Sequence, residues 1–327
     1  MAASRETDLR ALEPNLQVSF YYKLQTLKTL YLHEGLSSTV SQIPLALLDE
    51  ELARYAPQDS LSALASKGLR GELVFPVPCL LSQSPYLLGY YRLLYGFSQK
   101  ELYGKRGYGR FSGMEVRGDL GAARANQLPA LCHCLCRTGA KLIAALDDCS
   151  LCILHDLQLL TVGPQLRGSE NTRIGQSASK CVFDLIRGLV ESWLVETTLR
   201  TLIIRNASGR RVMVEFASDP DVSIIEKLPT DVRRLVSMEI KGGKDVSNIH
   251  NRLGEAEKSH QKARARGFFE FWTIINVPMT LEAARMESPT TGLLFMLDDI
   301  LAPSSSEHAR FRDLLASVIG IRTGGTA

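Results

Sequence analysis

The chain has 327 residues, of which 45% are hydrophobic and 22% are charged, and its formal net charge is +3. This length predicts two domains or one large domain with insertions, and the ordinary globular composition predicts a sizeable hydrophobic core. The small net charge excludes a chain that attracts polyanions over its whole surface, so any nucleic-acid site must be a local patch.

The first half of the chain is predicted to be mainly helical, because apolar residues recur at spacings of three and four. The predicted helices cover residues 15–33, 43–56, 85–103 and 126–160. Residues 69–81 are interrupted by two prolines and are expected to be extended. Residues 103–113 read as a glycine-rich loop that carries Arg106 and Arg110 among aromatic side chains.

A polar stretch over residues 161–180 contains three glycines and one proline, and it is the predicted boundary between the two halves. Short strands are predicted after it, at residues 201–205, 211–217, 222–226, 235–241 and 268–277. Helices are predicted at about 178–200, 245–266, 280–300 and 307–320. Because strands alternate with helices, the predicted fold class is α/β, with a mixed central sheet flanked by helices.

The amino-terminal residues show neither the basic start nor the apolar run of a signal peptide. No stretch reaches 18 uninterrupted apolar residues, so we expect a soluble protein with no membrane partner. The chain has seven cysteines, an odd number that cannot all pair within the chain, and reduced thiols are the natural interpretation. These features predict a cytoplasmic location.

Residues 218–226, "SDPDVSIIE", place two aspartates around Pro220, directly before a strand-like run. Proline restricts its own φ and favours an extended conformation for its neighbour, so Asp221 is expected to stand rigidly where the strand begins. Asp219 is more typical of a turn. A rigid carboxylate at such a position is either a structural cap or part of a metal site.

A second acidic residue follows in "MEIK", residues 238–241, where apolar and polar residues alternate. In a strand this alternation puts Glu239 and Lys241 on one face. Asp221, Glu239 and the backbone carbonyl of Ile240 would be hard oxygen ligands for Mg²⁺, and Lys241 would hold a water molecule or stabilise negative charge. The set suits phosphodiester hydrolysis. The alternative is that these residues are ordinary charges at a strand edge.

The order of elements, with Pro-Asp followed by Glu-x-Lys, resembles the PD-(D/E)XK nucleases. More specifically, the chain resembles the XcyI/XmaI-type restriction endonucleases. The stretches that carry this resemblance are "GELVFPVP", "LLGYYRLLYGFSQKELY", "SDPDVSIIE" and "MEIKGGKDVSNIHNRLGEAEKSHQKA". The resemblance implies a type II enzyme that needs Mg²⁺, binds duplex CCCGGG and cuts after the first cytosine to leave four-base 5′ overhangs.

The resemblance also implies an organisation and partners. We expect a mainly helical region over residues 1–165 that contributes to DNA recognition, a nuclease core over 175–280 and a helical segment over 281–327. A palindromic target implies a homodimer on double-stranded DNA. A cognate DNA methyltransferase is expected as a genetic partner only.

In this superfamily a glutamate on the helix before the first strand often assists the metal site. The predicted helix over 178–200 offers Glu191 and Glu196, and Glu191 is preferred because it lies beside the apolar face of that helix. The alternative is a solvated helix charge.

The predicted helix over 245–266 belongs to a basic segment, since residues 238–266 hold seven Lys/Arg against four Asp/Glu. Cations contact phosphates, and arginine or lysine commonly reads guanine edges. The candidate DNA contacts are Lys244, Asn251, Arg252, Lys258, Lys262, Arg106 and Arg110. The alternative is a solvated face with Glu–Lys pairs along the helix.

Three further interpretations of the sequence are a zinc site in one stretch and two alternative functions. Cysteines and a histidine within residues 132–152 resemble a zinc site, although the stretch is apolar and helix-like. Residues 91–104 resemble the start of a helix-turn-helix, which would suit a non-catalytic DNA-binding regulator. A repair or recombination nuclease of the same superfamily is the third alternative.

Overall fold

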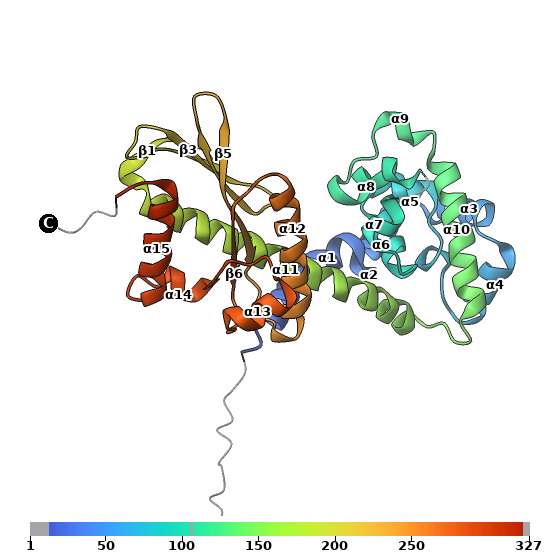
Figure 1. Ribbon diagram of the computed structural model, residues 1–327. Coiled ribbons are helices and arrows are strands. Elements are labelled where there is room, and N and C mark those ends of the chain that lie inside the picture. The colour runs from blue at the N-terminus through green and yellow to red at the C-terminus, as the bar shows by residue number, and fades with distance from the viewer. Residues whose placement is uncertain (1–12, 105–106, 323–327) are drawn as a thin grey trace, which may run out of the picture. The chain divides into compact units, whose positions relative to one another are not determined.

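The computed structural model describes residues 13–104 and 107–322 and divides into two compact units, Met1–Gly168 and Ser169–Ala327 (Figure 1). The boundary lies inside one long helix, α11 (Leu151–Leu189). The two units meet within the polar stretch 161–180, where the boundary was predicted, but this stretch is helical, because α11 continues through Pro164. Proline removes one backbone donor from a helix but does not always end it.

In the described part of the chain, the first unit has helices and no strands, which confirms the predicted mainly helical amino-terminal region. Before α11 its elements are α1 (Asn15–Tyr31), α2 (His33–Val40), α3 (Leu45–Tyr55), α4 (Gln58–Ser66), η1 (Gly71–Leu73), α5 (Pro78–Gln83), α6 (Leu87–Leu94), α7 (Gln99–Tyr103), η2 (Tyr108–Phe111), α8 (Ser112–Arg117), α9 (Ala122–Ala125) and α10 (Leu128–Ala145). The segment 69–81 is not wholly extended, because Pro78 begins α5 at a position that needs no backbone donor.

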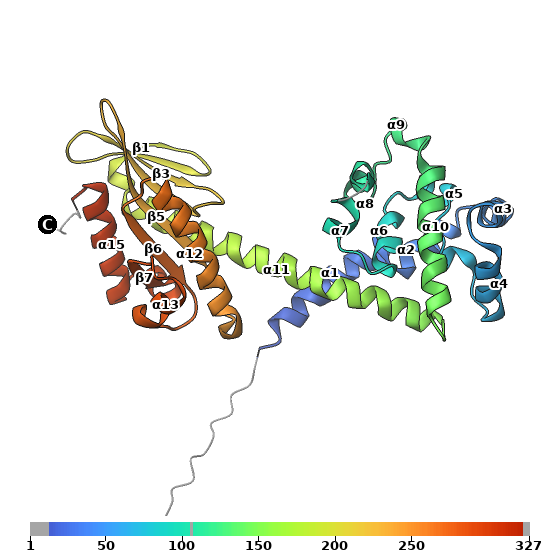
Figure 2. The same ribbon diagram turned by 45° about the vertical axis from the view of Figure 1, so that its right-hand side comes forward.

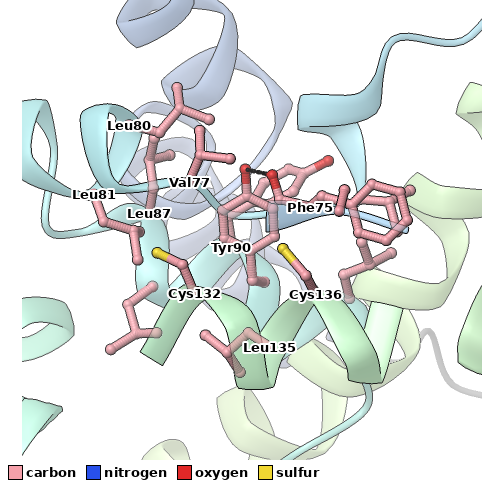
Figure 3. Packing of buried hydrophobic residues seen from close by; sticks show 14 of the residues in the cluster. Phe75, Val77, Leu80, Leu81, Leu87, Tyr90, Cys132, Leu135 and Cys136 are labelled. Atoms are coloured by element: carbon pink, nitrogen blue, oxygen red, sulfur yellow. Dashed lines mark hydrogen bonds between the residues drawn. The ribbon is translucent and has the colours of Figure 1, made fainter. Parts of the chain in front are cut away.

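Two cysteines of the first unit are part of its hydrophobic core. Cys132 and Cys136 lie four residues apart on α10 and point into the core beside Phe75 and Tyr90 (Figure 3). Burial raises the pKa of both thiols, which disfavours the thiolate form that binds zinc. Cys134, on the same helix, is exposed. Packing thus accounts for the two buried thiols of α10.

The predicted helix-turn-helix is also not formed as a DNA-reading unit. Ser98 and Glu101 do make a capping box, which begins α7 after the turn at Gly96. However, α7 is only five residues long. A recognition helix needs several exposed turns to lie in a groove of DNA, so α7 is too short for that role.

The second unit is built on a seven-stranded mixed sheet with the strand order β1-β2-β3-β4-β5-β6-β7. The strands are β1 (Leu194–Thr197), β2 (Thr201–Arg205), β3 (Arg211–Phe216), β4 (Val222–Lys227), β5 (Val232–Lys241), β6 (Glu270–Ile275) and β7 (Leu293–Met296). The first five are antiparallel, and β5, β6 and β7 are parallel. The remaining elements are η3 (Glu191–Trp193), η4 (Val246–Asn248), α12 (Ile249–Ala265), α13 (Leu281–Glu287), α14 (Leu297–Leu301) and α15 (Ser306–Ile319).

Helices cover both faces of this sheet, and β6 lies between α15 and α12 in both views (Figures 1 and 2). Strand alternation explains the layers. On β6, Trp272 and Ile274 join the core that includes α11 and α15, whereas Phe271 and Ile275 pack on the α12 side. The predicted α/β class, with a mixed sheet flanked by helices, is confirmed.

Two predicted helices contain strands instead. The helix predicted over 178–200 ends at Leu189, and β1 follows it. The segment predicted as a helix over 280–300 contains β7. β7 is a short apolar run, and the spacing of apolar residues cannot distinguish a strand from a helix in such a run. Among the described residues, no helix combines the length and apolar content that a membrane span requires.

Candidate active site

Asp221 and Glu239 stand side by side where β4 begins and β5 ends. Val222 pairs with Met238 across these antiparallel strands, so the register places the two acidic residues next to each other. The backbone N–H of Ile240 donates to Oδ2 of Asp221 at 2.7 Å, and the backbone N–H of Asp221 donates to Oε1 of Glu239 at 3.4 Å. Both carboxylates are thus held by the strand backbone.

Lys241 follows on the same face of β5, two residues after Glu239. Its Nζ lies 3.0 Å from Oε2 of Glu239, whose side chain is almost fully buried. The structure therefore brings together Asp221, Glu239 and Lys241, the three side chains that the sequence pattern predicts as a set. Their separation along the chain is bridged by one antiparallel strand pairing.

The ionisation of the three groups is strongly coupled to their burial and to one another. Burial raises the pKa of Asp221. Burial and the charge of Asp221 raise the pKa of Glu239 to about 7. Burial alone would lower the pKa of Lys241, but the charges of Glu239, Asp221 and Glu255 raise it above its ordinary value. Lys241 is therefore protonated at neutral pH, and the two carboxylates repel each other.

Asp219 has a different environment from Asp221, although the two flank the same proline, and the peptide bond between Asp219 and Pro220 is cis. Oδ2 of Asp219 lies 2.7 Å from Nζ of Lys262, and Oδ1 accepts from Ser259 at 3.2 Å. The hydrogen bond from Lys262 lowers the pKa of Asp219. These contacts connect the turn before β4 to α12.

Glu191 does not lie with the other predicted site residues. Gly242, at the end of β5, is in contact with Ala178 of α11, since a Cβ at Gly242 would overlap the Cβ of Ala178. α11 ends eleven residues after Ala178, roughly 16 Å along the helix axis, and the exposed Glu191 comes after that end. Glu196, the alternative, is exposed on β1.

Two of the predicted DNA-contacting cations near α12 are paired with carboxylates. Nζ of Lys244 lies 2.8 Å from Oδ2 of Asp298, and Lys262 pairs with Asp219. Lys258 is exposed, and no carboxylate in the described part of the chain pairs with it. Lys258 thus has the freest positive charge of the three.

Asn251 and Arg252 share a groove with one member of the predicted set. Together with Lys241 they line a groove of about 320 Å³. Nδ2 of Asn251 donates to Oδ1 of Asn248 at 3.0 Å. A Cβ at Gly243 would overlap the Arg252 guanidinium, so the second glycine of "KGGK" leaves room for this side chain.

The candidates of the first unit are only partly described. Arg106 lies outside the described residues. Arg110 is exposed, and its guanidinium donates to the carbonyl of Gly107 at 2.8 Å and to Oε1 of Gln127 at 2.9 Å. Both bonds leave the positive charge of Arg110 without a carboxylate partner among the described residues.

One acidic residue near the set escapes the sequence pattern. Glu255 of α12 lines the same groove as Lys241, and its charge contributes to the raised pKa of Lys241. The alternation of apolar and polar residues identifies Glu239 and Lys241 on their strand. The polar helix α12 has no such alternation, so nothing in the sequence distinguishes Glu255 from the other glutamate of that helix. Only the packing of α12 against β5 brings it to the site.

A divalent cation fits the pair formed by Asp221 and Glu239. The half-buried carboxylate of Asp221 and the buried carboxylate of Glu239, both with raised pKa values, are a donor set that gains from a positive charge between them. Among residues 13–104 and 107–322, no group of three or more His, Cys, Asp or Glu side chains is placed to hold a metal. Two carboxylates suffice for Mg²⁺, which commonly takes its other ligands from water and phosphate oxygens.

Comparison with known proteins gives concordant matches over nearly the whole chain. The family model described as XcyI restriction endonuclease matches residues 21–322. The chain is 42% identical over 321 residues to the type II restriction enzyme Cfr9I of Citrobacter freundii, covering 96% of this chain and 97% of that protein. It is 43% identical over 315 residues to the type II restriction enzyme XcyI of Xanthomonas campestris pv. cyanopsidis, covering 94% and 95%.

These matches confirm the family predicted from the quoted stretches, and with it the predicted enzyme class. They favour a restriction endonuclease over the repair nuclease and over the non-catalytic regulator. With its carboxylate pair on a mixed sheet and a match that extends from residue 21 to residue 322, the chain belongs to the XcyI restriction endonuclease family.

Proposed function

We propose that the protein is a type II restriction endonuclease that hydrolyses both strands of duplex DNA at CCCGGG, after the first cytosine, to give 5′-phosphate and 3′-hydroxyl ends. The observation that carries the proposal is the convergence of Asp221, Glu239 and Lys241 where the inner strand β4 begins and its neighbour β5 ends, in a chain of this family. The CCCGGG sequence itself rests on the resemblance alone.

In this proposal Asp221, Glu239 and the carbonyl of Ile240 hold Mg²⁺. When bound, Mg²⁺ neutralises the phosphate and makes a bound water molecule more acidic. Because Lys241 is protonated, its ammonium group is suited to orient that water or to stabilise the negative charge of the pentavalent transition state, and it is not suited to be a base. Burial of Glu239 excludes bulk water from one side of the pair.

The proposal is tested by digesting duplexes that differ only in sequence. With Mg²⁺ we expect cleavage of a CCCGGG duplex and none of a scrambled duplex of the same GC content. EDTA should stop the reaction. Ca²⁺ should support binding without turnover, because it activates bound water poorly. Sequencing of the ends then gives the cleavage position. Equal cleavage of both duplexes would contradict the restriction specificity and leave only a general nuclease.

A palindromic target also predicts the assembly. Two half-sites related by a two-fold axis are most simply read by a C₂ homodimer, because the same surface then meets the same bases twice. One chain supplies one set of Asp221, Glu239 and Lys241, so concerted cutting of both strands needs two chains. We further propose that residues 1–165 contribute to DNA recognition and that a cognate DNA methyltransferase is the genetic partner.

Light scattering of the protein on one specific duplex checks the assembly. We expect two chains of 36.1 kDa each per duplex. A single chain that binds the duplex and cuts both strands would contradict the dimer, while the assignment of the catalytic set would stand.

A further inference from the structure

A groove beside the carboxylate pair is lined on one side by a face of α11. This groove has a volume of about 1050 Å³ and includes Asp221 and Lys241 in its lining. On α11 the lining residues recur at spacings of three and four, which identifies a single helix face: they are Thr172, Gly175, Gln176, Ser179, Lys180, Phe183, Asp184 and Arg187. The turn between β1 and β2 and residues 216–218, which lead into the turn before β4, also line this groove.

Three cations in this groove have no carboxylate partner in the described ranges. Lys180, Arg187 and Arg200 are all exposed, and no carboxylate oxygen among residues 13–104 and 107–322 lies within ion-pair distance of any of them. Asp184 lies on the same helix face but makes no ion pair with them. This contrasts with Lys244 and Lys262 near α12, both of which are already neutralised by aspartates.

The groove is continuous with the site rather than separate from it. Gly175, Ile240 and Lys241 line both this groove and the smaller one that contains Asn251 and Arg252. A Cβ at Gly175 would meet nothing within 4 Å, so the helix surface is open at the point that the two grooves share. An extended polymer bound in one groove could therefore continue past Lys241 into the other groove.

The spacing of the cations suits a polyanion that runs along α11. Lys180 and Arg187 are two turns apart, roughly 10 Å along the helix axis. A DNA strand places a phosphate about every 3.4 Å along its axis, so the two side chains would reach different phosphates of one strand. The third cation, Arg200, lies in the turn between β1 and β2 and lines the same groove.

We propose that the α11 groove holds the sugar-phosphate backbone of the strand that is cut, with Lys180, Arg187 and Arg200 contacting phosphates that flank the scissile one. This inference rests on the proposed function, since it assumes DNA at Asp221 and Lys241. It adds a DNA-contacting surface on α11. The sequence pattern did not predict this surface, since it placed most DNA contacts near α12.

The test measures binding of a short fluorescent CCCGGG duplex by anisotropy, in Ca²⁺ and over a series of salt concentrations. The variants are Lys180→Gln, Arg187→Gln, Arg200→Gln and their triple combination. Because the proposed dimer carries each substitution twice, a single variant loses two phosphate contacts per duplex. Its slope of log K against log salt should therefore fall by about 1.8 in magnitude, which corresponds to roughly thirtyfold weaker binding at 0.15 M salt. The triple variant loses six contacts per duplex and should bind on the order of 10⁴-fold more weakly.

Matched variants separate a local effect from a general loss of charge or of fold. Arg205→Gln removes an exposed cation at the end of β2, outside the groove, and should keep the wild-type slope. Lys180→Arg keeps the positive charge and should therefore also keep the wild-type salt slope. Unfolding temperatures of all variants should stay close to that of the wild type, because the replaced side chains are exposed.

Two results would overturn the inference. One is a triple variant whose affinity and salt slope equal those of a wild-type protein that cuts CCCGGG. The other is a change in oligomeric state without a change in slope, which would make the groove a contact between chains. A wild-type protein that fails to cut any duplex would instead contradict the proposed function, so the two failures are distinguishable.

Discussion

Asp221→Ala, Glu239→Ala and Lys241→Ala are each expected to lower DNA cleavage by about 10²–10³-fold or more, because each removes a group that acts on the charge of the transition state. Single-turnover cleavage of a CCCGGG duplex at saturating protein measures this loss. The two carboxylate variants should also bind Mg²⁺ more weakly, whereas Lys241→Ala should spare metal binding. Metal binding is measured by calorimetry.

Matched variants give this result its meaning. Glu215→Ala and Lys227→Ala remove exposed charges from the neighbouring strands β3 and β4 and should cut at wild-type rate. Glu191→Ala should also retain cleavage, because Glu191 lies beyond the end of α11. If one of the three site variants cut DNA as fast as these controls, the role assigned to that residue would be wrong.

Glu239→Gln is expected to stabilise the metal-free protein at neutral and higher pH while it abolishes cleavage. Burial and the charge of Asp221 raise the pKa of Glu239 to about 7, from an ordinary value of 4.5. A carboxyl group whose pKa is higher in the folded state contributes stability below its unfolded pKa and loses it as the pH rises through its folded pKa. The window is therefore about pH 4.5 to 7.

The expected size follows from the same shift. Between pH 4.5 and 7 the wild type should lose roughly 3 kcal/mol of unfolding free energy relative to Glu239→Gln. Urea unfolding in EDTA at several pH values measures the difference. His260 has the opposite sign, since burial lowers its pKa to about 4 and its contribution is lost as the pH falls from 6.5. His260 is present in both proteins, so its contribution cancels in the comparison.

Mg²⁺ provides the control for this prediction. At pH 8 it should stabilise the wild type by about 2.7 kcal/mol at a hundredfold excess over its dissociation constant, and it should stabilise Glu239→Gln much less. A wild-type protein whose stability relative to Glu239→Gln did not depend on pH would show that the carboxylate pair is not strained by mutual repulsion. The catalytic assignment of Glu239 would then need another basis than a shared metal.

The sequence by itself determined the strands and residues of the proposed catalytic set. Pro220 before a strand-forming run and the alternation around Glu239 are local signals, and a period of two decides the face of a side chain without knowledge of the rest of the fold. The antiparallel pairing of β4 with β5 then follows from short connections. The predicted family depends on the same local stretches, and the comparisons confirm it.

Only the tertiary structure decided what surrounds the set. α11 continues through the polar stretch that looks like a linker, because each end of this helix buries its own apolar stripe, such as Val162 in the first unit and Val182 in the second. The middle of the helix therefore needs no apolar pattern. Glu191 was placed by analogy at the site, yet the helix meets Gly242 at Ala178 and carries Glu191 past it.

The same limit applies to the charges. Lys262 and Lys180 look alike in sequence, but Asp219 neutralises Lys262, and no described carboxylate pairs with Lys180. Which cations remain free for DNA depends on contacts between residues far apart in the chain. A pattern of periods and spacings contains no information about those contacts, because they form only when α11 and α12 pack against the sheet.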